Sequence, residues 1–145
     1  NPTGAAYTVA ELEALADVLR AHDCWIVSDE IYGGLVYDGF AQRSIVSVAP
    51  DLAPRVVIID GVSKTYAMTG WRVGWLIGPD DVVKAATNLQ SHATSNVANV
   101  SQIAALAARM LESGQHQRTV LALPVTAHKE QRAPIVHAVR CGRRV

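Results

Sequence analysis

The sequence predicts an α/β protein in which helices flank a mainly parallel β-sheet. Three features carry this prediction: a capped amphipathic helix near the N-terminus, short apolar runs typical of buried strands, and further helices after the strands. Half of the 145 residues are hydrophobic and 18% are charged, which is typical of a globular chain and not of a disordered one. The length is that of one ordinary domain.

The first helix is expected to begin after Thr8 and to run to about Ala21. Thr8 and Glu11 have the spacing of a capping box, in which each side chain satisfies a backbone amide at the helix start. Behind this cap, apolar residues recur at helical spacing, at Leu12, Leu15, Ala16 and Leu19. Residues 24–27 then predict a short strand buried on both faces, with Cys24 as one of its buried side chains.

Two more strands and two more helices follow. Residues 33–54 predict a mixed loop with one short helical turn, and residues 56–59 and 72–77 predict strands. A helix is expected over residues 79–92, because Pro is tolerated and acidic side chains are favoured at a helix start. The last helix is expected over residues 97–111. One of its faces carries Ile103, Leu106 and Met110.

Charge and composition exclude several classes of protein. Thirteen Lys and Arg balance thirteen Asp and Glu, so the molecule as a whole has no basic field to attract nucleic acid or a membrane surface. Two cysteines are too few for a disulfide framework and show no metal-ligand spacing, so no metal is expected. No apolar run reaches the roughly 18 to 20 residues that a membrane span needs. We therefore expect a cytoplasmic protein.

The composition changes near the C-terminus. From residue 115 onwards there are six Lys and Arg against a single acid, and the helical pattern is weak. The sequence therefore predicts one domain region over residues 1–111 and an atypical basic tail over residues 112–145. The chain opens on Asn1-Pro2, with neither an initiator Met nor a signal peptide, so we expect a fragment of a longer protein.

Reactive side chains follow the first two predicted strands at the point where each strand ends. Asp29 and Tyr32 come after the first strand, and Ser63 and Lys64 come after the second. If these two strands are parallel, both loops lie at the same edge of the sheet, which is where open α/β sheets bind their ligands. Arg72 lies further along the second loop. A carboxylate, a phenol, an amine and a guanidinium are then able to converge on one ligand.

Three motifs in this order resemble the pyridoxal-phosphate-dependent aminotransferases of the aspartate aminotransferase superfamily. They are Asn-Pro-Thr-Gly at residues 1–4, Ser-Asp-Glu-Ile-Tyr at residues 28–32, and Ser-Lys-Thr-Tyr-Ala-Met-Thr-Gly-Trp-Arg-Val-Gly at residues 63–74. The similarity is greatest to bacterial aspartate aminotransferases and covers residues 1–111. It implies that these residues are part of the cofactor-binding large domain of a fold type I aminotransferase, with pyridoxal 5'-phosphate as cofactor.

The resemblance also implies a role for each reactive side chain. Lys64 matches the catalytic lysine that bonds to the cofactor aldehyde and later moves the substrate's α-proton. Asp29 matches the acid that pairs with the pyridine nitrogen, and a close carboxylate keeps that nitrogen protonated. Tyr32 matches the phenol that contacts the 3-oxygen of the ring. Arg72 matches the guanidinium that clamps the phosphate, which suits the fork geometry of arginine.

Two further matches complete the implied cofactor site. Asn1 matches the amide that shares the contact with the 3-oxygen of the ring. Ser63 is a weaker match for a hydroxyl that binds the phosphate. Many relatives place Ser or Thr three residues before the lysine, where this chain has Gly61.

The function implied by the resemblance is transfer of an amino group from aspartate or a similar amino acid to 2-oxoglutarate, by an enzyme that is a homodimer. Neither nucleic acid nor a membrane is expected as a partner. Two alternatives share the same motifs: another fold type I enzyme such as a β-lyase, and an aminotransferase-like effector-binding domain of a transcription regulator. Relatives complete the site with groups outside this sequence, so we expect the 145-residue polypeptide by itself to be inactive.

Overall fold

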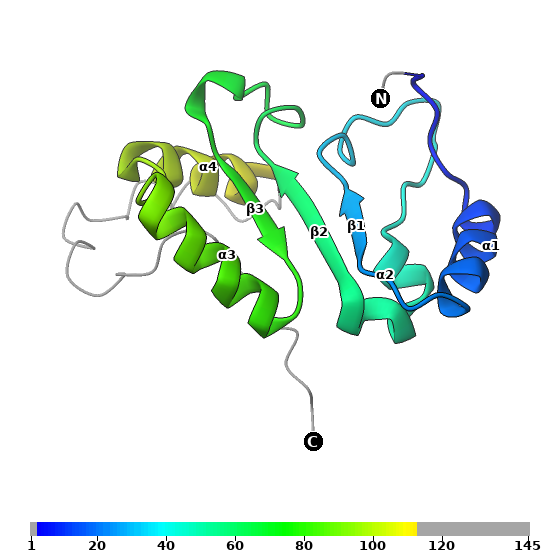
Figure 1. The fold of residues 1–145 in the computed structure, drawn as a ribbon. Coiled ribbons are helices and arrows are strands. Elements are labelled where there is room, and N and C mark those ends of the chain that lie inside the picture. The colour runs from blue at the N-terminus through cyan, green and yellow to red at the C-terminus, as the bar shows by residue number, and fades with distance from the viewer. Residues whose placement is uncertain (1–2, 113–145) are drawn as a thin grey trace.

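The computed structural model describes residues 3–112, which form a three-stranded sheet with helices packed around it (Figure 1). The strands β1 (Ile26–Asp29), β2 (Val56–Gly61) and β3 (Gly74–Ile77) lie in the order β1-β2-β3. β1 and β2 are parallel, as the sequence predicted, whereas β3 is antiparallel to β2. The α/β class with flanking helices is confirmed, and the described sheet contains one parallel and one antiparallel pair.

The connections explain these two directions. A parallel pair needs a long crossover, and residues 30–55 provide one that contains α2 (Ile45–Val48) and the 3-10 helix η1 (Pro50–Arg55). The connection from β2 to β3 contains only the single-turn 3-10 helix η2 (Thr69–Trp71). The backbone N–H of Val62, at the start of this connection, donates to the carbonyl of Val73, at its end, at 3.3 Å. The chain therefore turns back beside β2.

The three long helices agree with the sequence-based expectation to within about two residues. They are α1 (Val9–Arg20), α3 (Asp80–Ala93) and α4 (Asn99–Glu112). The capping box of α1 is present, because the Glu11 N–H donates to Thr8 Oγ1 at 3.3 Å and the Thr8 N–H donates to Glu11 Oε2 at 2.8 Å. These hydrogen bonds with Thr8 lower the pKa of the Glu11 carboxyl. None of the helices among residues 3–112 is long and apolar enough to cross a membrane.

Two apolar clusters pack at opposite ends of β2. The cluster at its beginning joins α1, α2, η1 and β2 through Leu12, Ala16, Ile45, Ala49, Leu52 and Val56. The cluster at its far end joins the β2–β3 connection to α4 through Val62, Val73 and Ala105. Both ends of β2 are thus fixed by packing, and the loop that follows β2 begins at the second cluster.

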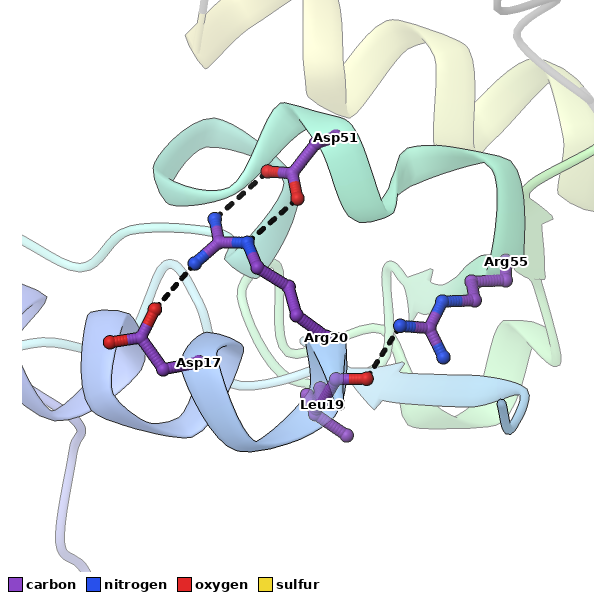
Figure 2. A network of polar contacts seen from close by, with 5 residues as sticks. All are labelled: Asp17, Leu19, Arg20, Asp51 and Arg55. Carbon is purple, nitrogen blue, oxygen red and sulfur yellow. Dashed lines mark hydrogen bonds and ion pairs between the residues drawn. The ribbon is translucent and has the colours of Figure 1, made fainter. Parts of the chain in front are cut away.

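A polar network holds the C-terminal end of α1 against η1 (Figure 2). The Arg20 guanidinium donates from Nε and Nη2 to the two carboxylate oxygens of Asp51, at 2.8 and 2.9 Å, and from Nη1 to Asp17 at 2.6 Å. The hydrogen bonds from Arg20 lower the pKa of the Asp51 carboxyl. Arg55 donates to the carbonyl oxygen of Leu19, one of the last residues of α1, which also accepts from the His22 N–H at 3.2 Å.

Burial differs from the sequence-based expectation at β1. Its residues alternate between half-buried and exposed, Val27 is 63% exposed, and Cys24 precedes the strand and is exposed. The prediction of a strand buried on both faces, with Cys24 inside, was therefore wrong. The reason is that α1 and α2 cover only the face of β1 that carries Ile26.

Burial in α4 also differs from a simple amphipathic pattern. Ile103 and Leu106 are exposed, whereas Ser101, Gln102 and Ala105 on the opposite side are buried. The buried amide of Gln102 is satisfied, because its Nε2 donates to the Val97 carbonyl at 2.6 Å. The helix therefore packs Ala105 against the β2–β3 connection, and the apolar side chains Ile103 and Leu106 are exposed.

Candidate functional site

The loops after β1 and β2 leave the same edge of the sheet (Figure 1). Parallel pairing places Asp29 beside Ile59 near the ends of the two strands, and the Glu30 N–H extends the pairing by donating to the Ile59 carbonyl at 2.8 Å. The loop of residues 30–44 and the loop of residues 62–73 therefore begin side by side. This confirms the expectation that both reactive loops share one edge.

Lys64 and Tyr32 meet across the two loops. The Lys64 Nζ lies 5.6 Å from the centroid of the Tyr32 ring, which is within the range of a cation–π contact. Tyr32 is 39% exposed and Lys64 is half-buried, so solvent still reaches this side of the sheet edge. Two of the side chains predicted from separate motifs are thus brought together by the fold.

Asp29 is the last residue of β1, and its side chain is turned back on its own loop. Its Oδ1 accepts a hydrogen bond from the Ile31 N–H at 3.2 Å, the local turn that Asp side chains favour. Residue 29 is exposed. A carboxylate has about four acceptor positions, so this single contact leaves room for a further donor.

The loop that carries Lys64 is held by its own hydrogen bonds. The Ala67 N–H donates to the Lys64 carbonyl at 3.1 Å, and Thr69 Oγ1 donates to the Ser63 carbonyl at 3.1 Å. Arg72 and Ala67 both have left-handed backbone conformations, with φ of 55° and 53°. Such conformations are uncommon for residues other than glycine. They help the chain to turn back within this short connection, so that β3 runs antiparallel to β2.

Arg72 stays within its own loop. Its Nη1 donates to the Thr69 carbonyl at 3.0 Å, and the residue is exposed. Within residues 3–112, no hydrogen bond or ion pair joins Arg72 to Lys64 or Asp29. The backbone of Ser63 takes part in the same local network through its carbonyl. Arg72 and Ser63 therefore lie in the Lys64 loop, and these hydrogen bonds stay within that loop.

Asp60 is a charged residue of this edge that the sequence indicated only as the end of a strand. Partial burial raises the pKa of its carboxyl, and the neighbouring charges of Glu30 and Asp29 raise it further. The Gly61 N–H, which donates to Asp60 Oδ1 at 2.6 Å, and the positive charge of Arg109 act in the opposite direction. Asp60 is paired with Trp75 of β3, and the sequence alone did not indicate this pairing.

Asn1 lies outside the described residues. Two surface grooves, of about 440 and 300 Å³, lie away from the strand edge. The larger one is lined by Val9, Glu13, Arg43, Ser47 and Val48. Among residues 3–112, no group of three or more His, Cys, Asp or Glu side chains is arranged to hold a metal ion.

Curated proteins of known name match most of the chain. The chain is 57% identical over 108 residues to the aspartate aminotransferase of Streptomyces avermitilis, and this match covers 74% of the chain and 26% of that protein. It is 51% identical over 108 residues to the aspartate aminotransferase of Bacillus subtilis, covering 74% of the chain and 28% of that protein. The chain thus spans little more than a quarter of the length of these relatives.

Solved structures match the fold as well. The aspartate aminotransferase of Rhizobium meliloti superposes with a TM-score of 0.69 at 39% identity, over 81% of this chain and 29% of that one. The aromatic aminotransferase of Pyrococcus horikoshii superposes with a TM-score of 0.71 at 33% identity, over 83% of this chain and 32% of that one. The fold is therefore part of the α/β fold of the fold type I aminotransferases.

The family follows from the same comparisons. The model of the family described as "aminotransferase class I and II" matches residues 1–140 of the chain. The chain belongs to this family, and the resemblance inferred from its three motifs is confirmed. The boundary drawn at residue 111 remains a prediction.

Proposed function

We propose that the protein to which this chain belongs is a pyridoxal-phosphate-dependent aminotransferase in which Lys64 is the catalytic lysine. One observation carries the proposal: Lys64 Nζ lies 5.6 Å from the Tyr32 ring, at the strand edge where Asp29 ends β1. A lysine, a phenol and a carboxylate at one edge are the groups that the cofactor needs. Family membership and the names of the relatives support the same activity.

The donor set fits pyridoxal 5'-phosphate. Asp29 has acceptor positions for a protonated ring nitrogen, and the half-exposed Tyr32 carries a hydroxyl suited to the 3-oxygen of the ring. Arg72 uses one of five N–H donors on the Thr69 carbonyl, so the guanidinium retains donors for a phosphate. Ser63 offers a hydroxyl from the same loop. In this proposal Asn1 shares the contact with the 3-oxygen.

Each residue then has a task in the transfer. Pyridoxal phosphate, when bound, supplies an electron sink for the electron pair left at the substrate's α-carbon. Lys64 would take the substrate's α-proton at Nζ and return it at the other reacting carbon. The Asp29 carboxylate holds the proton on the ring nitrogen. Arg72 and Ser63 would hold the phosphate, and the Tyr32 hydroxyl would bind the 3-oxygen of the ring.

The substrates we propose are aspartate or a similar amino acid and 2-oxoglutarate as the acceptor. Supporting this choice, the relatives from Streptomyces avermitilis and Bacillus subtilis are named aspartate aminotransferases. We further propose that the protein acts as a cytoplasmic homodimer. In this proposal residues 1–111 are part of its cofactor-binding large domain, and residues 112–145 form the basic tail.

Labelling of the lysines tests the proposal. The chain is mixed with pyridoxal phosphate, reduced with borohydride, and mapped by mass spectrometry. Lys84, an exposed lysine of α3, is the internal control. We expect Lys64 to be labelled at least about tenfold faster than Lys84, because the cofactor's phosphate and ring are held beside it. Label divided evenly between Lys64 and Lys84 would show that no cofactor site exists at this edge.

Two variants sharpen the result. Lys64→Ala is expected to abolish the preferred label and leave the label on Lys84 unchanged. Arg72→Ala is expected to weaken the preference without removing it, because the phosphate loses its guanidinium. Labelling of another lysine in Lys64→Ala at the rate seen for Lys64 in the unchanged chain would contradict the assignment.

A further inference from the structure

Glu30 lies between two reactive residues of the first loop, and its carboxylate binds both ends of that loop. Glu30 Oε1 accepts hydrogen bonds from Ser28 Oγ at 3.0 Å and from Ser44 Oγ at 2.6 Å. Ser44 is 14 positions later and stands directly before α2. Ser28 lies in β1. The carboxylate thus closes residues 30–44 into a loop whose two ends meet at Glu30.

The backbone of Glu30 is also fixed by hydrogen bonds. Its N–H donates to the Ile59 carbonyl of β2 at 2.8 Å, and its carbonyl accepts from the Gly33 N–H at 2.8 Å. The second of these bonds forms the turn that contains Tyr32. The position of Tyr32 therefore depends on where Glu30 is fixed.

The far side of this turn packs on the residue next to Lys64. A Cβ added at Gly34 would lie 2.4 Å from Thr65 Cγ2, so the backbone at Gly34 approaches Thr65 closely. The turn is thus fixed by Glu30 at one end and by Thr65 at the other. Tyr32 lies between them, with Lys64 Nζ 5.6 Å from its ring.

From these contacts we infer that Glu30 is a positioning residue, which sets Tyr32 and the first loop against Lys64 by holding Ser28 and Ser44. The inference rests on the proposed function of Lys64. Glu30 is half-buried, and its carboxylate accepts from Ser28 and Ser44, so it acts through the loop and not on the cofactor. Loss of its carboxylate leaves two hydroxyl groups without this acceptor and opens the loop at its base.

The test compares Glu30→Ala with Thr8→Ala in the 145-residue chain. Thr8→Ala weakens the cap of α1 and removes no hydrogen bond of Glu30, because the hydrogen bonds of the Thr8 side chain go to Glu11, and it serves as the control for a general loss of stability. We expect Glu30→Ala to slow the labelling of Lys64 by pyridoxal phosphate about tenfold, because misplacement by as little as 1 Å is costly for a reaction that depends on orientation. The rate in Thr8→Ala should equal that of the unchanged chain. All rates are measured at a temperature where every variant is folded.

A conservative variant separates positioning from charge. Glu30→Gln keeps an amide oxygen with two lone pairs, which is able to accept from both serine hydroxyls as Oε1 does, so most of the labelling rate should return. Ser44→Ala removes one of the two hydroxyl groups that donate to Glu30 and leaves Glu30 itself unchanged. It should slow labelling less than Glu30→Ala does. Equal rates in Glu30→Ala and the unchanged chain, or an equal loss in Thr8→Ala, would overturn the inference.

Amide hydrogen exchange gives a readout that is independent of the cofactor. Amides of residues 31–37 should exchange faster in Glu30→Ala than in Thr8→Ala, whereas those of α1 should not. If the unchanged chain shows no preference for Lys64, the proposed function fails and the exchange comparison still decides the role of Glu30. Unchanged exchange over residues 31–37 in Glu30→Ala would then overturn the positioning role by itself.

Discussion

At the scale of single residues, the Asp60 carboxylate is held where ionisation is unfavourable. Partial burial and the charges of Glu30 and Asp29 raise its pKa, against the Gly61 N–H and Arg109. A raised folded-state pKa favours the fold below the ordinary carboxyl pKa of about 4, and this contribution is lost as pH rises through the raised value. Asp60 therefore makes the folded state less stable at neutral pH than a neutral residue of the same shape would.

This sign gives a prediction for Asp60→Asn. The variant should be more stable than the unchanged chain at neutral pH, by about 1 kcal/mol or less because the site is only half-buried. The difference should vanish as the pH falls below about 4. Urea unfolding at a series of pH values measures it, with the exposed Asp23→Asn as control. A variant less stable than the unchanged chain at pH 7 would contradict the prediction.

The cap of α1 gives a second prediction at the residue scale. Thr8→Ala removes the acceptor of the Glu11 N–H and should lower the free energy of unfolding by about 1 kcal/mol. Thr8→Ser keeps the hydroxyl and should lose much less. The midpoint and slope of urea unfolding provide the measurement. Equal stability of the Ala and Ser variants would show that the cap contributes nothing.

At the scale of elements, the close approach between the two loops depends on the absence of a side chain at Gly34. Gly34→Ala places a Cβ 2.4 Å from Thr65 Cγ2 and must push Thr65 aside. We expect a loss of stability of about 1 to 3 kcal/mol and slower labelling of Lys64. Gly70→Ala is the matched control, since a Cβ at that position meets no atom within 4 Å.

A second substitution tests the mechanism of this effect. Thr65→Ala removes the two atoms nearest to the added Cβ, so the double variant Gly34→Ala, Thr65→Ala should regain part of the stability lost by Gly34→Ala. Thermal unfolding of the single and double variants measures this coupling. Strictly additive effects would show that the two loops do not touch at this point.

At the scale of the whole molecule, part of one face of the sheet and one stripe of α4 are apolar and exposed. Trp25, Val27 and Ile59 are 57%, 63% and 42% exposed, and strand alternation and register place the last two on the same sheet face. The stripe of α4 contains Val100, Ile103, Leu106 and Leu111. Contiguous exposed apolar surface is unusual in a monomeric soluble protein.

The exposed sheet face predicts that the 145-residue chain binds hydrophobic dyes and self-associates as its concentration rises. The double variant Val27→Thr, Ile59→Thr keeps β-branched residues in the strands and should reduce dye fluorescence several-fold, because both apolar side chains leave the exposed face. Leu89→Gln, at an exposed position of α3, is the control. Dye binding that does not change in the double variant would show that the dye binds to a surface other than this sheet face.

Local signals in the sequence were sufficient for the long helices, for the approximate positions of the strands and for the family. The Thr8 cap and the apolar spacing predicted α1, and the motifs around Asp29 and Lys64 predicted that both loops share the edge of a parallel pair, which the structure confirms. The roles of Asn1, Asp29, Tyr32, Ser63, Lys64 and Arg72 toward the cofactor remain proposals. Such features are readable because capping, periodicity and motif spacing depend on residues close together in the chain.

Contacts between distant residues were decided only by the tertiary structure. Among these are the antiparallel direction of β3, the open face of β1, the outward apolar stripe of α4, and the meeting of Glu30 with Ser44. No local pattern specifies them, because an apolar side chain has the same periodicity whether or not another element covers it. A carboxylate likewise shows its hydrogen-bond partners only when folding brings them within about 3 Å.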